Sequence, residues 1–197
     1  MKLLGNEKLL KITYKILTVL LSICWVIMAC WGLFMFVKVK YLYPLSFKEE
    51  IIEYADYYGH DRALIFAVVK TESGFDKNAV SSAGAIGLMQ ITEKTGKYIA
   101  QRLGVENYDL NDVETNLDFG CFYIKYLILR FENLDTALIA YNAGEGNVAL
   151  WLQNKEYSTD KKTLINIPFS ETNEYIKKIH ENFSKYKKIY GKFLDKV

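Results

Sequence analysis

Glu72 is the residue of this sequence best placed for acid–base chemistry. Leu64, Val68 and Glu72 follow one another at intervals of four residues, so they share one stripe of a helix. A carboxylic acid therefore stands where the apolar face would otherwise continue. Apolar surroundings disfavour a charged carboxylate and raise its pKa, which lets a general acid hold a proton near neutral pH. An exposed glutamate in the last turn of an ordinary helix is the alternative.

Further polar and glycine-rich segments follow this helix in a fixed order. Together they resemble the soluble lytic transglycosylase family of lysozyme-like enzymes, which are relatives of goose-type lysozyme. The resemblance extends from about Phe47 to about Ile179, and it implies an all-α, lysozyme-like fold. The segments that carry it are residues 72–75 (ESGF), 84–90 (GAIGLMQ), 140–144 (AYNAG) and 168–175 (PFSETNEY).

The resemblance implies cleavage of peptidoglycan glycan strands at the β-1,4 bond between N-acetylmuramic acid and N-acetylglucosamine. Glu72 would protonate the leaving oxygen while the N-acetyl carbonyl of the substrate attacks its own anomeric carbon. Glu72 would then take a proton from the C6 hydroxyl, which closes a 1,6-anhydro ring. Asp76 lies beyond the Ser73-Gly74 break in a polar loop, where we expect a solvated side chain. Two alternatives remain: a muramidase that lets water attack, and a non-catalytic glycan-binding scaffold of an envelope assembly.

The same resemblance assigns substrate contacts to a second group of residues. Ser81 and Gln90 match the polar contacts of the family, and the tyrosines match its cleft-lining phenols. A phenol hydroxyl beside the reacting N-acetyl group would donate a hydrogen bond to its carbonyl. Packing in the core is the alternative for the methionine and for both tyrosines. The assigned residues are Ser81, Met89, Gln90, Tyr141, Asn142 and Tyr175.

The cysteines and histidines argue against a metal or cofactor site. Cys24 and Cys30 lie in an apolar run, and Cys121 shares a helical apolar face with Leu117 and Ile124, which indicates a packed small residue. The chain has only two histidines, too few beside one cysteine for a typical zinc site. We therefore predict neither metal nor cofactor.

An uncharged run of 22 residues, 16–37, predicts a transmembrane helix. At about 1.5 Å per residue the run is about 33 Å long, enough for a bilayer core of about 30 Å. Its lysine-rich flank is chiefly N-terminal, which favours an N-terminus in the cytoplasm and a domain outside the cytoplasmic membrane, on the cell-wall side. A cleaved signal peptide, a buried core helix and lipidation at Cys30 are the alternatives.

Composition and the residues that begin or end helices divide the chain into segments. The formal net charge of +2 is too small to predict nucleic-acid binding, and 51% hydrophobic residues suffice for a core. We expect a cytoplasmic segment (1–15), the transmembrane helix (16–37), a linker (38–46) and a catalytic domain (47–197). Within the domain the pattern predicts helices over 47–58, 62–73 with Asp61 as N-cap, 90–103, around 117–131, 136–143 with Asp135 as N-cap, 147–154 and a long terminal stretch, with no strands.

Overall fold

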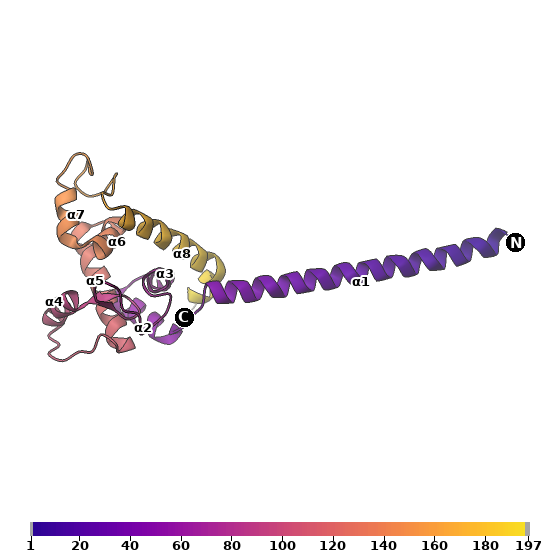
Figure 1. The fold of residues 1–197 in the computed structure, drawn as a ribbon, viewed down its shortest axis with the longest axis horizontal. Helices are drawn as coiled ribbons and strands as arrows, with labels where there is room; N and C mark the ends of the chain where they lie inside the picture. The colour runs from indigo at the N-terminus through magenta and orange to yellow at the C-terminus, as the bar shows by residue number, and fades with distance from the viewer. Residues whose placement is uncertain (1, 196–197) are drawn as a thin grey trace. The chain divides into compact units, whose positions relative to one another are not determined.

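The computed structural model describes residues 2–195; Met1 and residues 196–197, the ends of two predicted segments, lie outside the described residues. The chain divides into two compact units, Met1–Pro44 and Leu45–Val197. Helices dominate both units, as the apolar run predicted for the first and the resemblance for the second. The elements (Figure 1) are α1 (Lys2–Leu42), α2 (Lys48–Tyr58), α3 (Arg62–Glu72), β1 (Ala85–Ile86), β2 (Ile91–Thr92), α4 (Glu93–Leu103), α5 (Val113–Phe131), α6 (Leu134–Ala143), α7 (Glu145–Trp151) and α8 (Ser170–Leu194).

Helix α1 contains the predicted transmembrane run. The stretch Lys11–Leu42 is long and apolar enough to cross a membrane, and none of its most apolar part is buried inside the protein. A core helix of a soluble protein would be mostly buried, so that alternative fits poorly. Length and composition leave the choice between an anchor and a signal sequence open.

Helix α3 forms the centre of the second unit. Every residue from 63 to 69 is buried, so protein surrounds this helix on all sides. Helices α2 and α8 pack against it. The Phe66 ring of α3 lies 5.5 Å from the Tyr186 ring of α8 and 6.2 Å from the Phe75 ring, measured between centroids. The fold thus holds the end of α3, and Glu72 with it, by packing along its whole length.

Helix α5 carries the second half of the core. Residues Leu117, Cys121 and Ile124 are buried on one face, as the apolar spacing predicted. Helices α2, α4 and α6 pack against α5. Helix α5 therefore connects α2, which packs on α3, to α4 and α6.

The helix boundaries show where local sequence rules are sufficient. The Asp61 side chain accepts a hydrogen bond from the Ala63 N–H, which confirms the predicted N-cap of α3. Asp135 was the wrong choice for α6: the Asn133 side chain accepts from the Thr136 N–H instead, and the helix begins at Leu134. The two polar residues are two positions apart, and composition alone does not choose between them.

A small antiparallel sheet, absent from the prediction, precedes α4. Ala85 pairs with Thr92 and Ile86 with Ile91. The expected helix start at Gln90 is wrong because Gln90 has φ of 50°, in the left-handed region, which interrupts a helix. Helix α4 begins at Glu93 instead, where Thr92 caps it.

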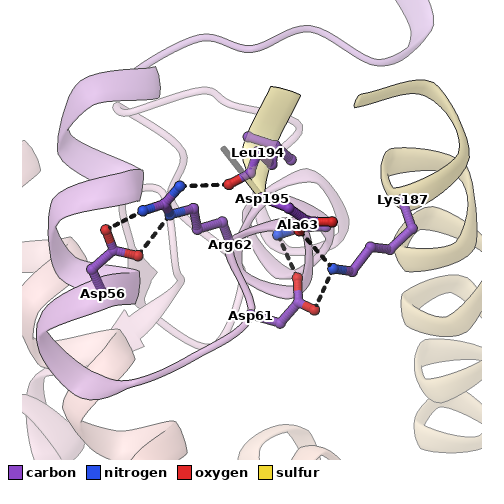
Figure 2. A network of polar contacts seen from close by, with 7 residues as sticks. All are labelled: Asp56, Asp61, Arg62, Ala63, Lys187, Leu194 and Asp195. Carbon is purple, nitrogen blue, oxygen red and sulfur yellow. Dashed lines mark hydrogen bonds and ion pairs between the residues drawn. The ribbon is translucent and has the colours of Figure 1, made fainter. Parts of the chain in front are cut away.

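Arg62 connects the start of α3 to the two neighbouring helices. Its Nε and Nη2 atoms donate to the two carboxylate oxygens of Asp56 at 2.7 and 2.6 Å. Its Nη1 atom donates to the carbonyl of Leu194, the last residue of α8 (Figure 2). One guanidinium therefore holds the end of α2, the start of α3 and the end of α8 together.

Lys187 adds a second connection between α3 and α8. Its Nζ atom lies 2.7 Å from an Asp61 carboxylate oxygen and 3.1 Å from an Asp195 carboxylate oxygen (Figure 2). The other Asp61 oxygen caps α3. The same aspartate thus begins the helix and positions the terminal helix beside it.

We expect Arg62→Met to lower the free energy of unfolding by about 1 kcal/mol, because the change removes an ion pair to the exposed Asp56 carboxylate and leaves the Leu194 carbonyl without this donor. Urea denaturation of the full chain in mild detergent, followed by circular dichroism, measures the change. Lys185→Met removes one exposed positive charge from α8 and should stay within about 0.5 kcal/mol of wild type. Equal transitions for all three proteins would contradict the role of Arg62.

Candidate active site

A cleft of about 470 Å³ lies at the C-terminal end of α3. Its walls come from α3, the segment that includes β1 and β2, and helices α4, α5, α6 and α8. The structure brings six of the seven sequence-predicted site residues to this cleft, although they are up to 103 positions apart in the chain. These six are Glu72, Ser81, Gln90, Tyr141, Asn142 and Tyr175.

The Glu72 carboxyl is half-buried in the cleft. Burial raises its pKa from the ordinary value near 4.5 to about 7, while a hydrogen bond from Tyr175 lowers the pKa in part. The Tyr175 hydroxyl donates this bond to Glu72 Oε1 at 2.7 Å. At neutral pH both the acid and the carboxylate forms of Glu72 are therefore populated.

The chain turns sharply after Glu72. Gly74 and Phe75 follow with φ of 61° and 71°, both in the left-handed region. This conformation is unfavourable for phenylalanine, but its ring packs into the core beside Phe66. Glu72 is therefore the last residue of α3, and its side chain faces an open space instead of a further helical turn.

Two tyrosines face the same cleft from α6 and α8. Burial raises the pKa of both Tyr141 and Tyr175 well above the usual value, and the charge of Glu72 is the second cause of this rise. Both hydroxyls therefore keep their protons as donors. The Tyr141 hydroxyl donates to the Met89 carbonyl at 2.7 Å, so its proton is engaged within the protein and not directed at a ligand.

Met89 lies outside the cleft, which corrects the assignment of its side chain to substrate. The side chain has no exposed surface and packs against Gly120 of α5. A Cβ atom at Gly120 would lie 2.2 Å from Met89 Sδ, so α5 has room for this side chain only because glycine is present. Met89 therefore packs in the core, which was the alternative interpretation of this residue.

Asn116 is a supporting residue that the sequence analysis missed. It is buried in α5, its Oδ1 accepts from the Met89 N–H at 2.8 Å, and its Nδ2 donates to the Ile86 and Leu110 carbonyls at 2.9 and 2.8 Å. A Cβ at Gly87 would lie 2.4 Å from Nδ2. Asn116 stands in the polar run 111–118, just before the predicted helix, and no local pattern there distinguishes it from its polar neighbours.

Gln90 and Ser81 form hydrogen bonds within the loop wall of the cleft. Gln90 Nε2 donates to the Gly87 carbonyl at 2.9 Å and to the Ala79 carbonyl at 3.1 Å. Ser81 Oγ accepts from the Ala85 N–H at 3.0 Å. Both side chains therefore shape the wall that they also line.

Asn142 joins the two helices on the opposite side of the cleft. Its Oδ1 accepts from the Thr172 hydroxyl at 2.7 Å, although the side chain is largely exposed. This bond connects the end of α6 to the first turn of α8. Tyr141 and Tyr175 are thereby held in neighbouring positions.

The other carboxylates near Glu72 differ from it in environment. Asp76 is exposed, accepts from the Asn78 N–H and does not line the cleft. Glu171 and Glu174 line the cleft but are exposed, and the ion pair with Lys177 lowers the pKa of Glu174. Glu72 thus differs from both glutamates in being partly shielded from solvent by the surrounding protein.

Neither a cysteine nor a metal cluster contributes to the cleft. Cys121 is fully buried in α5, and burial raises the pKa of its thiol. Within residues 11–195 no group of three or more histidine, cysteine, aspartate or glutamate side chains is arranged to hold a metal ion. Proton transfer and hydrogen bonding are thus the chemistry that the described side chains offer.

Comparison with known proteins adds a family match to this geometry. The model of the "Transglycosylase SLT domain" matches residues 49–165. The soluble lytic murein transglycosylase of Salmonella typhimurium is 30% identical over 155 residues, covering 76% of this chain and 24% of that protein. The membrane-bound lytic murein transglycosylase C of Edwardsiella ictaluri is 30% identical over 163 residues, covering 67% of this chain and 44% of that protein.

A solved structure agrees with the sequence matches. The crystal structure of the 70 kDa soluble lytic transglycosylase from Escherichia coli superposes with a TM-score of 0.68 at 29% identity. The match covers 78% of this chain and 26% of the other. The chain thus spans about a quarter of the length of these soluble relatives.

We expect Glu72→Gln to stabilise the protein more at pH 8 than at pH 5. Below about pH 4.5 both the folded and unfolded forms of Glu72 are protonated, so the pKa shift contributes nothing. As the pH rises toward 7 the unfolded state releases its proton first, which destabilises the native state by roughly 1–3 kcal/mol once the buried group must ionise. Glutamine does not titrate and avoids this loss.

Urea denaturation of both proteins from pH 5 to pH 8.5 measures the effect. Asp76→Asn is the matched control, because it removes an exposed carboxylate outside the cleft. A stability gap between Glu72→Gln and wild type that stays constant with pH would contradict the raised pKa.

Proposed function

The chain belongs to the transglycosylase SLT domain family, and on that premise we propose that it is a membrane-anchored lytic transglycosylase of peptidoglycan. It cleaves the β-1,4 bond between N-acetylmuramic acid and N-acetylglucosamine and leaves 1,6-anhydro-muramic ends. The names of the relatives support peptidoglycan as the substrate class. The residues of the cleft support the route.

The observation that carries the proposal is the half-buried Glu72 carboxyl at the end of α3, which lines the cleft and accepts a hydrogen bond from Tyr175. A group with a pKa of about 7 donates and accepts a proton with similar ease at neutral pH. Lytic cleavage needs both steps from one group: a proton delivered to the leaving oxygen, then a proton removed from the C6 hydroxyl. The hydrogen bond from Tyr175 keeps Oε1 in place, which leaves Oε2 for the substrate.

A substrate-assisted first step fits a cleft with one proton-holding carboxyl group. The N-acetyl oxygen forms a bond to the anomeric carbon as the glycosidic bond breaks, and Glu72 transfers its proton to the leaving oxygen. The C6 hydroxyl then attacks the anomeric carbon, the oxazolinium ring reopens and Glu72 recovers a proton. Substrate assistance replaces the second carboxylate of ordinary glycosidases.

The two tyrosines support this step in different ways. Tyr175 contacts Glu72 directly and positions the acid. Tyr141 is a positioning residue for the cleft wall, because its bond to the Met89 carbonyl ties α6 to the loop before α4. The hydroxyl oxygen of Tyr141 keeps its lone pairs and accepts from a substrate N–H without giving up that bond.

Hydrolysis by a muramidase is the second candidate, and one observation favours it. Glu171 and Glu174 line the same cleft as Glu72, and either carboxylate is a candidate base for an attacking water. Both are exposed, and Glu174 is paired with Lys177. The products separate the candidates, since hydrolysis leaves reducing ends and the lytic route leaves anhydro ends.

A non-catalytic scaffold fits the cleft less well. A half-buried carboxyl with a raised pKa destabilises the folded protein whenever it ionises. Glycan binding alone does not need a carboxyl group with a raised pKa, whereas acid–base catalysis near neutral pH does. Locally unfavourable features of this kind concentrate at catalytic sites.

For the chain as a whole we propose a cytoplasmic segment over residues 1–15, a membrane-spanning helix over 16–37, a linker over 38–46 and the catalytic domain over 47–197. The apolar helix α1 and the membrane-bound relatives support membrane association. The lysine-rich N-terminal flank supports an inside N-terminus, with the cleft on the cell-wall side of the cytoplasmic membrane.

Digestion of purified sacculi by the full chain should release muropeptides with 1,6-anhydro-muramic ends, identified by mass spectrometry. Glu72→Gln should reduce the rate by about 10⁴-fold or more, because one residue serves both proton transfers and each is typically worth 10²–10⁴-fold. Reducing ends as the main product would replace the lytic route with hydrolysis. Undiminished release by Glu72→Gln would refute acid catalysis by this residue.

Two further variants complete this assay, of which Asp76→Asn is the control. Asp76→Asn should retain full activity, since its side chain is exposed outside the cleft. Tyr141→Phe should lose about 10–100-fold through the missing bond to Met89, which corresponds to about 1.5–3 kcal/mol. If the unmutated protein is active but Asp76→Asn is inactive, the arrangement with Glu72 as the single catalytic carboxyl group is wrong.

Protease added to intact spheroplasts should remove the domain, since we place residues after the linker outside. The same treatment of permeabilised cells provides the control for protease susceptibility. A domain that survives in intact spheroplasts but not in permeabilised cells would reverse the proposed topology.

A further inference from the structure

A cluster of tyrosine rings continues the wall of the cleft beyond Tyr141. The ring of Tyr123 lies 5.6 Å from that of Tyr141, and both residues line the cleft. The rings of Tyr126 and Tyr98 lie 6.0 and 6.5 Å from that of Tyr123 and 5.6 Å from each other, so these three rings form one cluster. Tyr98 and Tyr126 do not line the cleft itself, so the aromatic wall extends past its edge.

Two helices supply this extension through residues on one face each. On α4, Thr95 lines the cleft, Tyr98 follows one turn later and Arg102 two turns later. On α5, Tyr123 lines the cleft and Tyr126 follows one turn later. The two faces therefore run from the cleft to Arg102.

Arg102 is a cation without an anionic partner beside this cluster. Its guanidinium lies over the rings of both Tyr98 and Tyr126, with 4.8 Å from Cζ to each centroid. The side chain is exposed, and no carboxylate of residues 11–195 lies within ion-pair distance of it. Cation–π contact with two rings restrains the side chain without neutralising its charge.

The rings beneath Arg102 are fixed from the other side. The Tyr126 hydroxyl donates to Glu145 Oε2 at 2.9 Å. Arg130 Nη1 donates to the Tyr126 hydroxyl at 2.8 Å and to the same Glu145 oxygen at 2.6 Å. Glu145 therefore neutralises Arg130, and Arg102 is left as the unpaired positive charge on a rigid platform.

We propose that Arg102 forms a carboxylate-binding subsite that holds the peptide stem carried by the muramic sugar in the cleft. The proposal rests on the proposed function, which places a peptidoglycan strand beside Glu72. A stem peptide is attached to that sugar and bears free carboxylates. Arg102 binds one of them next to the glycan that occupies the cleft.

The chemistry of the platform favours a carboxylate over a further sugar ring. The guanidinium covers the faces of Tyr98 and Tyr126 that a sugar would otherwise stack on. A stacked guanidinium presents its N–H edge outward, and that edge matches the two oxygens of a carboxylate. Since the rings already restrain the side chain, little conformational entropy is lost on binding.

Binding of three defined ligands to the full chain in detergent tests the subsite. The ligands are a muramic tetrasaccharide with free-acid stems, the same tetrasaccharide with amidated stem carboxylates, and the glycan without stems. Calorimetry with Glu72→Gln as the background prevents turnover. Adding Arg102→Gln should weaken binding of the free-acid ligand by about 5–20-fold and leave the other two unchanged.

Two further variants separate charge from geometry. Arg102→Lys keeps the charge but loses the bidentate edge, so we expect an intermediate loss for the free-acid ligand. Lys97→Gln removes one exposed positive charge from another part of α4, at a separate hollow of the surface, and should bind all three ligands normally. Equal loss for Lys97→Gln and Arg102→Gln would overturn the subsite in favour of general electrostatic attraction.

The outcomes also separate this proposal from the proposed function. If the protein with Glu72 intact cleaves the stem-bearing glycan but Arg102→Gln binds all three ligands like its parent, the subsite is wrong and the lytic function stands. The subsite is also wrong if Arg102→Gln weakens the stemless glycan equally. No cleavage and no binding of any ligand by the parent protein would overturn both.

Discussion

Burial away from water lets a carboxyl group keep its proton near neutral pH, and the packing of α3 provides that condition for Glu72. Residues 63–69 are buried on every side, so the helix cannot shift to give its last residue more solvent. Arg62 and Lys187 tie its first turn to α2 and α8. The pKa of about 7 is thus a property of the whole helix and its neighbours.

The second wall of the cleft depends on a different kind of interaction. Residues 84–92 have little regular structure, and contacts from α5 hold them in place. The buried side-chain amide of Asn116 forms hydrogen bonds with the backbone of this segment. Gly87 and Gly120 permit this contact because a Cβ at either position would overlap Asn116 or Met89. Tyr141 then binds the Met89 carbonyl, which couples the same turn to α6.

Local sequence rules predicted most of the helices, but they missed the small sheet and the contacts between elements. The helical spacing before Glu72, the Asp61 cap and the apolar face of α5 are short-range patterns, and each has its counterpart in the structure. The core position of Met89 and the role of Asn116 depend on residues about 30 positions apart. Such contacts depend on how the helices pack. No local periodicity encodes this packing.

The charges around the cleft are arranged so that an anion-binding cation does not weaken the acid. A cation beside Glu72 would lower its pKa and remove the proton. Burial and the Tyr175 bond account for the pKa of Glu72, with no cation contributing. Arg102 lies two helical turns, about 10 Å along α4, beyond the cleft residue Thr95. At physiological salt, exposed charges are largely screened beyond about 8 Å. The protein therefore combines a raised pKa at Glu72 inside the cleft with the unpaired positive charge of Arg102 outside it.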